Sequence, residues 1–482
     1  MITFSLDLSA PTTPFPHYWE TVIGSGHAAL GLRADWRQQL TWCQAELGFQ
    51  YVRFHGLLCD DMSVYTQWSN FPPYSFFNVD SVFDFLLSIG MKPFVELSFM
   101  PRDMASGSQT IFHYQGNVTP PADYEAWAAM IRALVAHCVD RYGLDEVRTW
   151  FFEVWNEPNL APGFWAGSQE DYFKLYHYTA EAIKSVDPGL RVGGPSTAKN
   201  AWIPDMIAYC QQHDVPLDFV STHHYPTDTA LGWDMDLKAQ MGHAKRGVMQ
   251  DMTQTARQEA GDLPLYYTEW NCSSSLRNPY QDESYLAAFV IKTIVDNGGL
   301  VDGYAYWVFS DLFEETPFPS LPFHGGFGLM TLHGVPKPVY RAYELLHGLG
   351  HERMPITVTG GTSETVEAVA TRRADQIDIL VYNHNVPLAP IETETVQIML
   401  KNCAPIDSAA VRRIDADHAN PKQRWIEVGQ PQYIRADTVE QLLAASVMQM
   451  TPLTPHTTGP DLTFELAIPP HGVAAVQLNG VG

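Results

Sequence analysis

Apolar and polar positions alternate with two different periods between about residues 20 and 350. Residues 51–56 (YVRFHG) and 92–98 (KPFVELS) are short, mostly apolar runs of strand length. Residues 80–90 (DSVFDFLLSIG), which lie between them, repeat apolar side chains at helical spacing and end at a glycine. The same alternation predicts further strands at 149–158, 191–196, 218–226, 265–271 and 303–311, and further helices at 124–143, 169–186, 202–212, 242–260, 282–297 and 337–348.

Repeated strand–helix units joined by short loops are typical of a parallel sheet. With a first strand near residues 20–31, the chain holds about eight such units. Eight units predict an α/β fold, a closed (β/α)8 TIM barrel over residues 15–350. The structural alternative is an open doubly wound sheet, which usually carries a glycine-rich phosphate turn after its first strand. The chain contains no G-x-G-x-x-G sequence, so we favour the barrel.

The pattern changes after about residue 350, where apolar and polar residues alternate with a period of two between turn residues. This alternation predicts an accessory β-sandwich domain over residues 351–482. The segment TFSLDLSA, within residues 1–14, also has the pattern of a strand and is not followed by a helix. This segment is therefore a candidate strand of the sandwich. Strands are predicted within 355–385, at 394–400 (ETVQIML), at 424–429 (RWIEVG) and within 462–478.

Acidic residues outnumber basic residues 54 to 29, and the formal net charge is −25. This charge disfavours a nucleic-acid partner, because protein surfaces that bind phosphates are basic. No run of about eighteen uncharged apolar residues is present, so we expect no membrane partner. The six cysteines form no C-x-x-C pair, and the N-terminal segment lacks the features of a signal peptide, so we expect reduced thiols in a cytoplasmic protein. A homo-oligomer is left open.

Polar side chains gather at the ends of the predicted strands, where barrel enzymes carry their chemistry. The strand period places Glu153 and Glu157 on one face of FFEVWNEP, and only Glu157 lies at the strand exit. We expect Glu153 to be a structural carboxylate held by Arg53, because a buried carboxylate needs a partner; a catalytic role is the less favoured alternative. Other side chains at strand exits are His55, Asn156, His223, Tyr225, Glu269, Asn271 and Trp307.

Glu157 and Glu269 close the fourth and seventh predicted strands, in the sequences WNEP and YTEW. Two carboxyl groups that face each other across a small pocket can cleave a glycosidic bond, one as acid and the other as nucleophile or as base toward water. The acid must stay protonated near neutral pH, which partial burial and a neighbouring negative charge both favour. A non-catalytic carbohydrate-binding barrel is the alternative from another class, and the presence of both glutamates disfavours it.

The sequence resembles the clan A glycoside hydrolases, and within that clan it is similar to glycoside hydrolase family 39, in particular to its bacterial β-xylosidase branch. The segments that carry the resemblance span roughly residues 24–315 and include GSGHAALGLRADW, LGFQYVRFHGLLCDDM, FFEVWNEPNL, RVGGPST, THHYPTD, YYTEWN and YWVFSDLFEE. The resemblance implies a retaining double displacement in which Glu157 is the general acid/base and Glu269 is the nucleophile.

The resemblance also implies roles for the side chains around the two glutamates. Asn156 would bind the sugar 2-hydroxyl, and Arg53 would keep Glu269 ionised. Tyr225 would contact the nucleophile, and Trp307 would form the floor of the sugar site. The side chains implied to lie nearby or to line the pocket are His223, His55, His224, Phe112, Glu315 and His324. We expect no cofactor and no metal, since the histidines lack ligand spacing such as H-E-x-x-H.

We therefore expect an exo-acting retaining β-1,4-xylosidase that releases xylose from short xylo-oligosaccharides, which are small-molecule substrates. An α-L-iduronidase or another clan A glycosidase is the alternative enzyme. Among the assigned strand ends Arg53 is the only cation, so we expect a neutral pentoside rather than a uronide, whose carboxylate needs a cationic cradle. A basic side chain from a loop, such as Arg277, would change this expectation.

Overall fold

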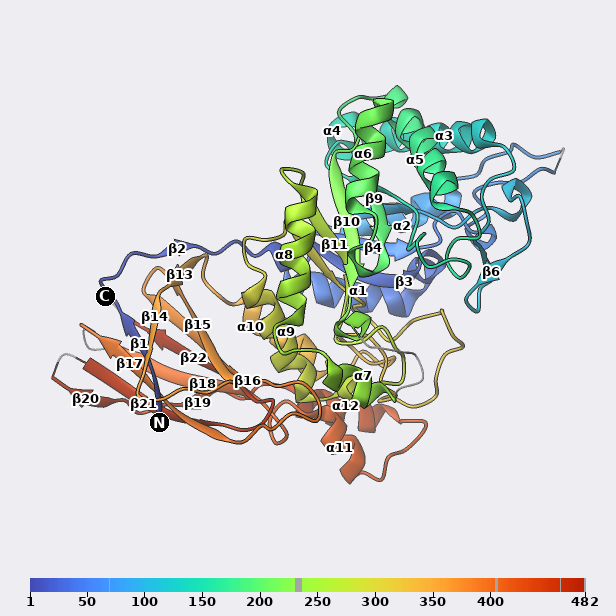
Figure 1. Ribbon diagram of the computed structural model, residues 1–482. Helices are drawn as coiled ribbons and strands as arrows, with labels where there is room; N and C mark the ends of the chain where they lie inside the picture. The colour runs from blue at the N-terminus through green and yellow to red at the C-terminus, as the bar shows by residue number, and fades with distance from the viewer. Residues whose placement is uncertain (69, 230–235, 404–405, 460, 481–482) are drawn as a thin grey trace.

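A computed structural model describes residues 1–68, 70–229, 236–403, 406–459 and 461–480. Its larger part is a closed barrel of eight parallel strands (Figure 1). The last barrel strand pairs with the first, which closes the sheet and confirms the (β/α)8 prediction. In barrel order the strands are β3 (Val22–His27), β4 (Tyr51–His55), β5 (Lys92–Leu97), β8 (Phe151–Val154), β9 (Arg191–Thr197), β10 (Phe219–His224), β11 (Leu265–Trp270) and β12 (Gly303–Tyr306).

Helices that connect the barrel strands form the outer layer of the barrel, and α11 (Pro421–Glu427) and α12 (Ala436–Ser446) follow later in the chain. One predicted helix is divided into two in the structure. The predicted helix 242–260 begins at Val248, with Gly247 as its N-cap, and residues 237–243 form a separate short helix. No helix among the described residues is both long and apolar enough to cross a bilayer. The other helices are α1 (Ala34–Leu47), α2 (Phe77–Ser88), α3 (Tyr124–Tyr142), α4 (Leu144–Val147), α5 (Gln169–Val186), α6 (Ile203–His213), α7 (Leu237–His243), α8 (Val248–Ala260), α9 (Ser284–Asp296) and α10 (Pro338–His347).

Two further sheets pack face to face beside the barrel (Figure 1). Their facing side chains form a second core, to which Phe4 contributes from one sheet and Ile379 from the other. The first sheet has the order β14 (Ile356–Thr359), β1 (Ile2–Asp7), β17 (Glu394–Lys401), β21 (Asp461–Ile468), β20 (His456–Thr458). The second has the order β19 (Thr451–Pro452), β18 (Ser408–Ile414), β22 (Val473–Asn479), β16 (Gln376–Asn383), β15 (Val366–Arg373), β13 (Glu352–Met354), β2 (Thr13–Pro14). β6 (Thr110–Ile111) and β7 (Gly116–Asn117) form a small separate hairpin.

The predicted strand at 424–429 is wrong, because α11 occupies most of this segment. Pro421 fits the first turn of a helix, where its missing N–H is not needed, and the side chain of Asn420 accepts a hydrogen bond from a backbone N–H of the same turn. Trp425 on this helix then packs against Phe323, with 5.6 Å between ring centroids. This contact supports the long loop between β12 and α10, which also borders the candidate site.

The two ends of the barrel differ in chemistry. At the amino ends of the strands, Phe94, Phe151, Phe219 and Tyr266 form a buried aromatic cluster, in which Phe94 and Phe151 stack with ring centroids 4.8 Å apart. These rings fill that end of the barrel with apolar material. Polar side chains of the strands therefore gather toward the carboxyl ends, as expected for a barrel enzyme.

Candidate active site

Arg53, on β4, is the centre of a buried ion-pair network. Its Nε lies 2.6 Å from Glu153 Oε2, and its Nη2 lies 2.9 Å from Glu96 Oε2. Arg53 Nη2 also donates a hydrogen bond to Asn156 Oδ1 at 2.9 Å. These side chains are almost completely buried, and removing one partner from such a network leaves a costly unpaired charge. The expectation that Arg53 holds Glu153 is confirmed.

The chain turns sharply between β8 and Glu157. Strand pairing ends at Val154, so the regular alternation expected up to Glu157 does not continue. Trp155 and Glu157 have φ values of 72° and 47°, in the left-handed region that costs about 1–2 kcal/mol for a residue with a Cβ. The surroundings hold this conformation: Glu157 N–H donates to Ser196 O at 2.7 Å, and the Trp155 indole N–H donates to Phe164 O at 2.8 Å. Strain of this kind concentrates at functional sites.

Glu157 and Glu269 form a close pair next to the Arg53 network. One carboxyl oxygen of each lies within 4.8 Å of the other, and the two residues are 6% and 7% exposed. Tyr225 Oη donates a hydrogen bond to Glu269 Oε1. Among the described residues, Glu269 Oε2 has no hydrogen-bond partner, although Arg53 Nη1 lies 3.7 Å away. This oxygen is therefore available to a substrate.

Hydrogen bonds around His223 indicate which ring nitrogen carries a proton. Thr268 Oγ1 donates to Glu153 Oε1 at 2.7 Å, so it is free to accept the N–H of His223 Nε2, which lies 3.1 Å away. Burial lowers the pKa of His223 to about 4, so the ring is neutral and Nδ1 keeps its lone pair. Nδ1 lies 3.0 Å from Glu157 Oε1 and can accept the proton of a carboxylic acid there.

The electrostatics of the pair favour a protonated Glu157 at neutral pH. Burial raises the pKa of Glu157 to about 7, and the positive charges of His55 and Arg53 oppose this rise without cancelling it. Burial also raises the pKa of Glu269, with a further contribution from the charge on Glu157, and the cationic Arg53 opposes this rise. Because the two carboxyl groups are close, one charge disfavours the other, and the pair favours one proton and one charge.

Both glutamates line a cavity of about 180 Å³. Trp307 and His55 form part of its wall, with ring centroids 4.7 Å apart. His55 Nδ1 lies 2.7 Å from Glu96 Oε2, and His55 Nε2 lies 3.7 Å from Glu315 Oε1. The residues that line the cavity are His55, Asn156, Glu157, Leu160, Phe164, Ala198, Lys199, Tyr225, Asp228, Glu269, Ser274, Trp307, Glu315 and Phe327.

Two further acids in this wall are not simple negative charges. Burial raises the pKa of Glu315 well above its usual value, and the charges on Glu269 and Glu157 raise it further. Burial raises the pKa of Asp228 to about 7, although Tyr225 N–H donates to Asp228 Oδ2 at 2.8 Å. Near pH 7 these groups are therefore partly or largely protonated and can donate hydrogen bonds to sugar hydroxyls.

Of the residues that the family resemblance places in or near the pocket, His223 contacts Glu157 without lining the cavity, and three others lie farther from it. Neighbouring residues of a strand face opposite sides, so His224 points away from the side of β10 that His223 faces. There, His224 Nε2 lies 2.5 Å from Tyr304 Oη, and the His224 ring stacks on Tyr267. Phe112 lies behind the wall and stacks on His55, with 6.1 Å between ring centroids. His324 lines a separate cavity, described next.

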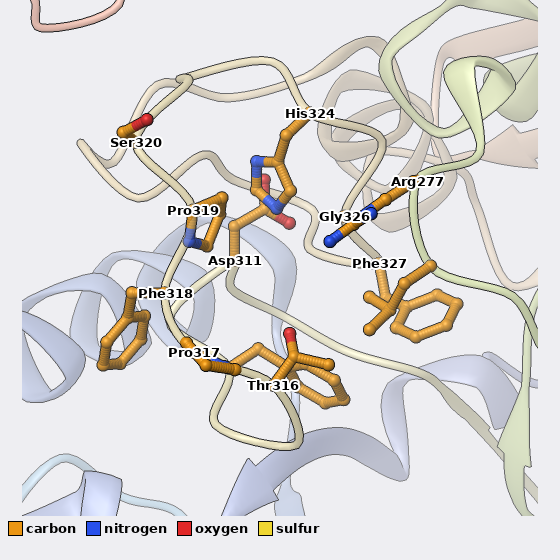
Figure 2. A pocket seen from close by; sticks show the side chains of 12 residues that line it. Arg277, Asp311, Thr316, Pro317, Phe318, Pro319, Ser320, His324, Gly326 and Phe327 are labelled. Carbon is orange, nitrogen blue, oxygen red and sulfur yellow. The ribbon is translucent and has the colours of Figure 1, made fainter. Parts of the chain in front are cut away.

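Figure 2 shows this second cavity, of about 390 Å³, into which His324, Arg277 and Asp311 point. Phe327 borders both cavities, so the two are neighbours. Arg277 does not line the cavity of the two glutamates.

Lys199 is a site residue that the strand pattern does not reveal, and it is a basic side chain that reaches the site from outside the strand ends, the alternative that was left open beside Arg53. It follows β9 in a short 3-10 turn with φ of 62°, and its charge lowers the pKa of Glu157 and of Asp228. Asp228 comes from a 3-10 turn at Pro226–Thr229, and Ser274 comes from the loop after β11. The conformation of the segments after the strands places all three, and only the sequence neighbourhood of THHYP pointed toward Asp228.

The donor atoms of Glu157, His223 and Glu269 lie close enough to surround a metal ion, within 4.8 Å of one another. His223 Nδ1 is already engaged with Glu157, and Glu269 Oε1 with Tyr225. This arrangement favours proton transfer over metal binding.

Residues 3–459 match the Glycosyl hydrolases family 39. The chain belongs to this family. A β-xylosidase of Caldicellulosiruptor saccharolyticus is 50% identical over 96% of this chain and 95% of that protein. A β-xylosidase of Geobacillus stearothermophilus is 37% identical over 91% of this chain and 88% of that protein. The crystal structure of a monomeric β-xylosidase from Caulobacter crescentus CB15 has a TM-score of 0.86 and 32% identity, and covers 100% of both chains.

Membership of family 39 confirms the resemblance seen in the sequence and makes the chain a glycoside hydrolase. A more distant relative of this chain is the α-L-iduronidase of Homo sapiens, which is 23% identical over 90% of this chain and 71% of that protein. Glu157 and Glu269 thus lie in a cavity at the strand ends of a family 39 barrel.

Proposed function

We propose that this family 39 enzyme is an exo-acting β-xylosidase that retains the anomeric configuration. The observation that carries the proposal is the short distance between the carboxyl groups of Glu157 and Glu269, within 4.8 Å. Retaining glycosidases have carboxyl groups about 5 Å apart, whereas inverting enzymes leave about 6.5–9.5 Å for a water molecule. The names of the two β-xylosidase relatives support the substrate class.

In the first step, Glu269 Oε2 attacks the anomeric carbon and forms a glycosyl ester, while the bond from that carbon to the leaving oxygen breaks. The leaving oxygen takes the proton of Glu157, which becomes a carboxylate. Glu269 Oε2 suits this attack because it has no hydrogen bond within the described chain, and Tyr225 holds the other oxygen. Asn156 Oδ1 is bound to Arg53, so its Nδ2 is directed elsewhere and can donate to the 2-hydroxyl.

In the second step, water gives a proton to Glu157 and its oxygen attacks the anomeric carbon, which breaks the ester to Glu269. Glu157 ends the cycle protonated and Glu269 ends it as a carboxylate. A pKa of about 7 suits both halves of this cycle, because a group that acts as acid and then as base works best near the ambient pH.

The dimensions of the cavity support exo action on a pentoside. Its volume of about 180 Å³ is below the about 300–1,000 Å³ of pockets that take drug-sized ligands, so it suits one sugar unit. Trp307 and Phe164 line it and restrict space beside the ring, which favours a sugar without a C6 group. The neighbouring cavity beyond Phe327 offers space for the rest of the substrate.

Proton NMR of the first sugar released from an aryl β-xyloside tests the mechanism. We expect β-xylose to appear first and α-xylose to follow only by mutarotation. If α-xylose appears first, the enzyme inverts, and Glu269 is not the nucleophile.

Catalytic efficiency on matched aryl β-xyloside, β-glucoside and α-L-iduronide tests the substrate class. We expect the xyloside to lead the glucoside by tens-fold, because one excluded group is worth on the order of 1–3 kcal/mol. Lys199 in the wall is the one observation that favours the α-L-iduronidase alternative, since it could pair with a uronate. Faster turnover of the iduronide than of the xyloside would establish that alternative, and Lys199→Gln would then abolish the preference.

A further inference from the structure

A second group of titratable side chains lies outside the catalytic pair, near the carboxyl ends of β3 and β4. His27 ends β3, whereas Cys59 and Asp61 follow β4 in a loop with a 3-10 turn at Asp60–Met62. One donor atom from each of the three residues lies within 4.8 Å of the others. The group does not line the catalytic cavity, but Glu314, which contacts His27, directly precedes Glu315 of that cavity.

The two ring nitrogens of His27 have different surroundings. Nδ1 lies 3.2 Å from Glu314 Oε2 in hydrogen-bonding geometry, so it can donate its proton to that carboxylate. In the neutral imidazole, Nε2 then keeps its lone pair, and this atom is buried with no hydrogen-bond partner among the described residues. A carboxylate on one nitrogen and a free lone pair on the other are the arrangement of a histidine that binds a metal.

The distances around Nε2 match those between ligands of one small ion. Asp61 Oδ2 lies 3.2 Å from His27 Nε2 but outside hydrogen-bonding geometry. Two ligands of a tetrahedral zinc ion, each about 2.0–2.2 Å from it, are about 3.3–3.6 Å apart, which is close to this contact. Cys59 Sγ lies on the same side of the ring, because a Cβ added to Gly56 would be 3.0 Å from Sγ and 3.3 Å from Nε2.

The surroundings hold these donors and leave a path for an ion. The ring of Tyr114 stacks on His27 with centroids 3.7 Å apart and planes 6° apart, which fixes the imidazole plane. His27 and Cys59 are 1% and 4% exposed. The side chain of Asp61 is 44% exposed, so an ion and its bound water can enter from solvent.

We propose that His27 Nε2, Cys59 Sγ and Asp61 Oδ2 bind one thiophilic divalent cation such as zinc, with water as the fourth ligand. Binding converts the Cys59 thiol to a thiolate and releases its proton to solvent. A set of sulfur, nitrogen and oxygen donors in tetrahedral geometry selects zinc over calcium or magnesium, which prefer oxygen ligands and higher coordination numbers. The site is independent of the proposed sugar specificity.

A proton is the competing occupant of this site. Burial disfavours the charged form of His27, but its contacts with Asp61, Cys59 and Glu314 outweigh burial and raise its pKa well above the usual value. An imidazolium that bridges Asp61 and Glu314 would explain the two 3.2 Å contacts without a metal. A spectroscopic probe that detects a bond between metal and sulfur separates the two cases.

Cobalt(II) titration of the full chain, treated with chelator and kept reduced, tests the proposal. We expect one equivalent of cobalt to produce the visible bands of tetrahedral Co(II) and a near-ultraviolet thiolate-to-cobalt charge-transfer band, and zinc to remove both. Cys59→Ala should lose the charge-transfer band. The matched control Cys138→Ala, which changes a buried thiol on the outer helix α3, should keep it.

Asp61→Asn provides a variant at an exposed position that keeps the fold. We expect it to weaken cobalt binding at least tenfold while the charge-transfer band persists at saturation. Absence of the bands in the native protein, a band that survives Cys59→Ala, or unchanged affinity in Asp61→Asn would overturn the assignment.

Discussion

Glu157→Gln should stabilise the protein at alkaline pH, because it removes a carboxyl group from a place where burial disfavours its charge. Glu157 is 6% exposed, and burial raises its pKa to about 7. In the unfolded chain the same group titrates near 4.5. Since the pKa is higher in the folded state, the contribution of Glu157 to stability is complete below pH 4.5 and is lost as the pH rises through about 7.

The size of this loss follows from the two pKa values. Each pKa unit corresponds to about 1.4 kcal/mol, so a rise from 4.5 to about 7 corresponds to about 3 kcal/mol above pH 7. An unfolding entropy of about 2.1 cal/mol/K per residue converts this energy into a change in Tm of about 3 °C when the whole chain unfolds together. Glutamine has nearly the shape of glutamic acid, so the packing is preserved.

Urea denaturation of the native protein and of Glu157→Gln, followed by circular dichroism at pH 5 and pH 8.5, measures the effect. We expect the difference in the free energy of unfolding to grow by about 2.5 kcal/mol in favour of Glu157→Gln between these pH values, because part of the effect is already lost at pH 5. Glu465→Gln, which changes an exposed glutamate on β21, is the control and should show no such growth. An equal difference between Glu157→Gln and native protein at both pH values would refute the raised pKa of Glu157.

Three further changes test other parts of the site and of its support. His223→Phe removes the acceptor for the Glu157 proton, so the alkaline limb of the kcat/KM profile against pH should move to lower pH; an unmoved limb would contradict the hydrogen-bond assignment. Lys337→Met leaves Asp282 and Asp311 buried without their cation and should cost about 3–5 kcal/mol in urea denaturation, whereas a loss below about 1 kcal/mol would show that water reaches them. Glu157→Ala, but not Glu269→Ala, should turn over an activated aryl xyloside faster with azide and yield β-xylosyl azide; an equal response of both variants would exchange or cancel the two roles.

The barrel was predictable because, in each strand–helix unit, the hydrophobic period and the segment length indicate the same type of element. The segment 51–56 forms β4, 92–98 forms β5, and the predicted helix 124–143 is observed at 124–142. The strand prediction for 424–429 was wrong because the apolar residues of so short a segment fit a helical period as well as a strand period. Asn420 and Pro421, which precede the segment, favour a helix as its N-cap and first residue.

The site was predictable where strand ends determine position and unpredictable where loops do. Glu157 and Glu269 follow from the ends of β8 and β11. His223 and His224 had to face opposite sides, but the sequence does not say which one faces Glu157. Lys199 lines the cavity of the two glutamates because it lies in a left-handed turn, and the local sequence pattern does not predict this turn.

The raised pKa values also depend on burial that becomes visible only in three dimensions. Arg53 was expected to keep Glu269 ionised, yet Arg53 lies closer to Glu153 and Glu96, and burial raises the pKa of Glu269. The sequence shows which charged groups exist, whereas the packing decides which of them pair.

Trapping the glycosyl-enzyme tests the central claim most directly, that Glu269 forms a covalent bond with the sugar. An activated 2-deoxy-2-fluoro-β-xyloside slows both steps, so the ester should accumulate and can be located by peptic digestion and mass spectrometry. We predict one fluoroxylosyl group per chain, on the peptide that contains Glu269, and none in Glu269→Gln. A label on Glu157, or continued turnover of the natural substrate by Glu269→Gln, would contradict the assignment.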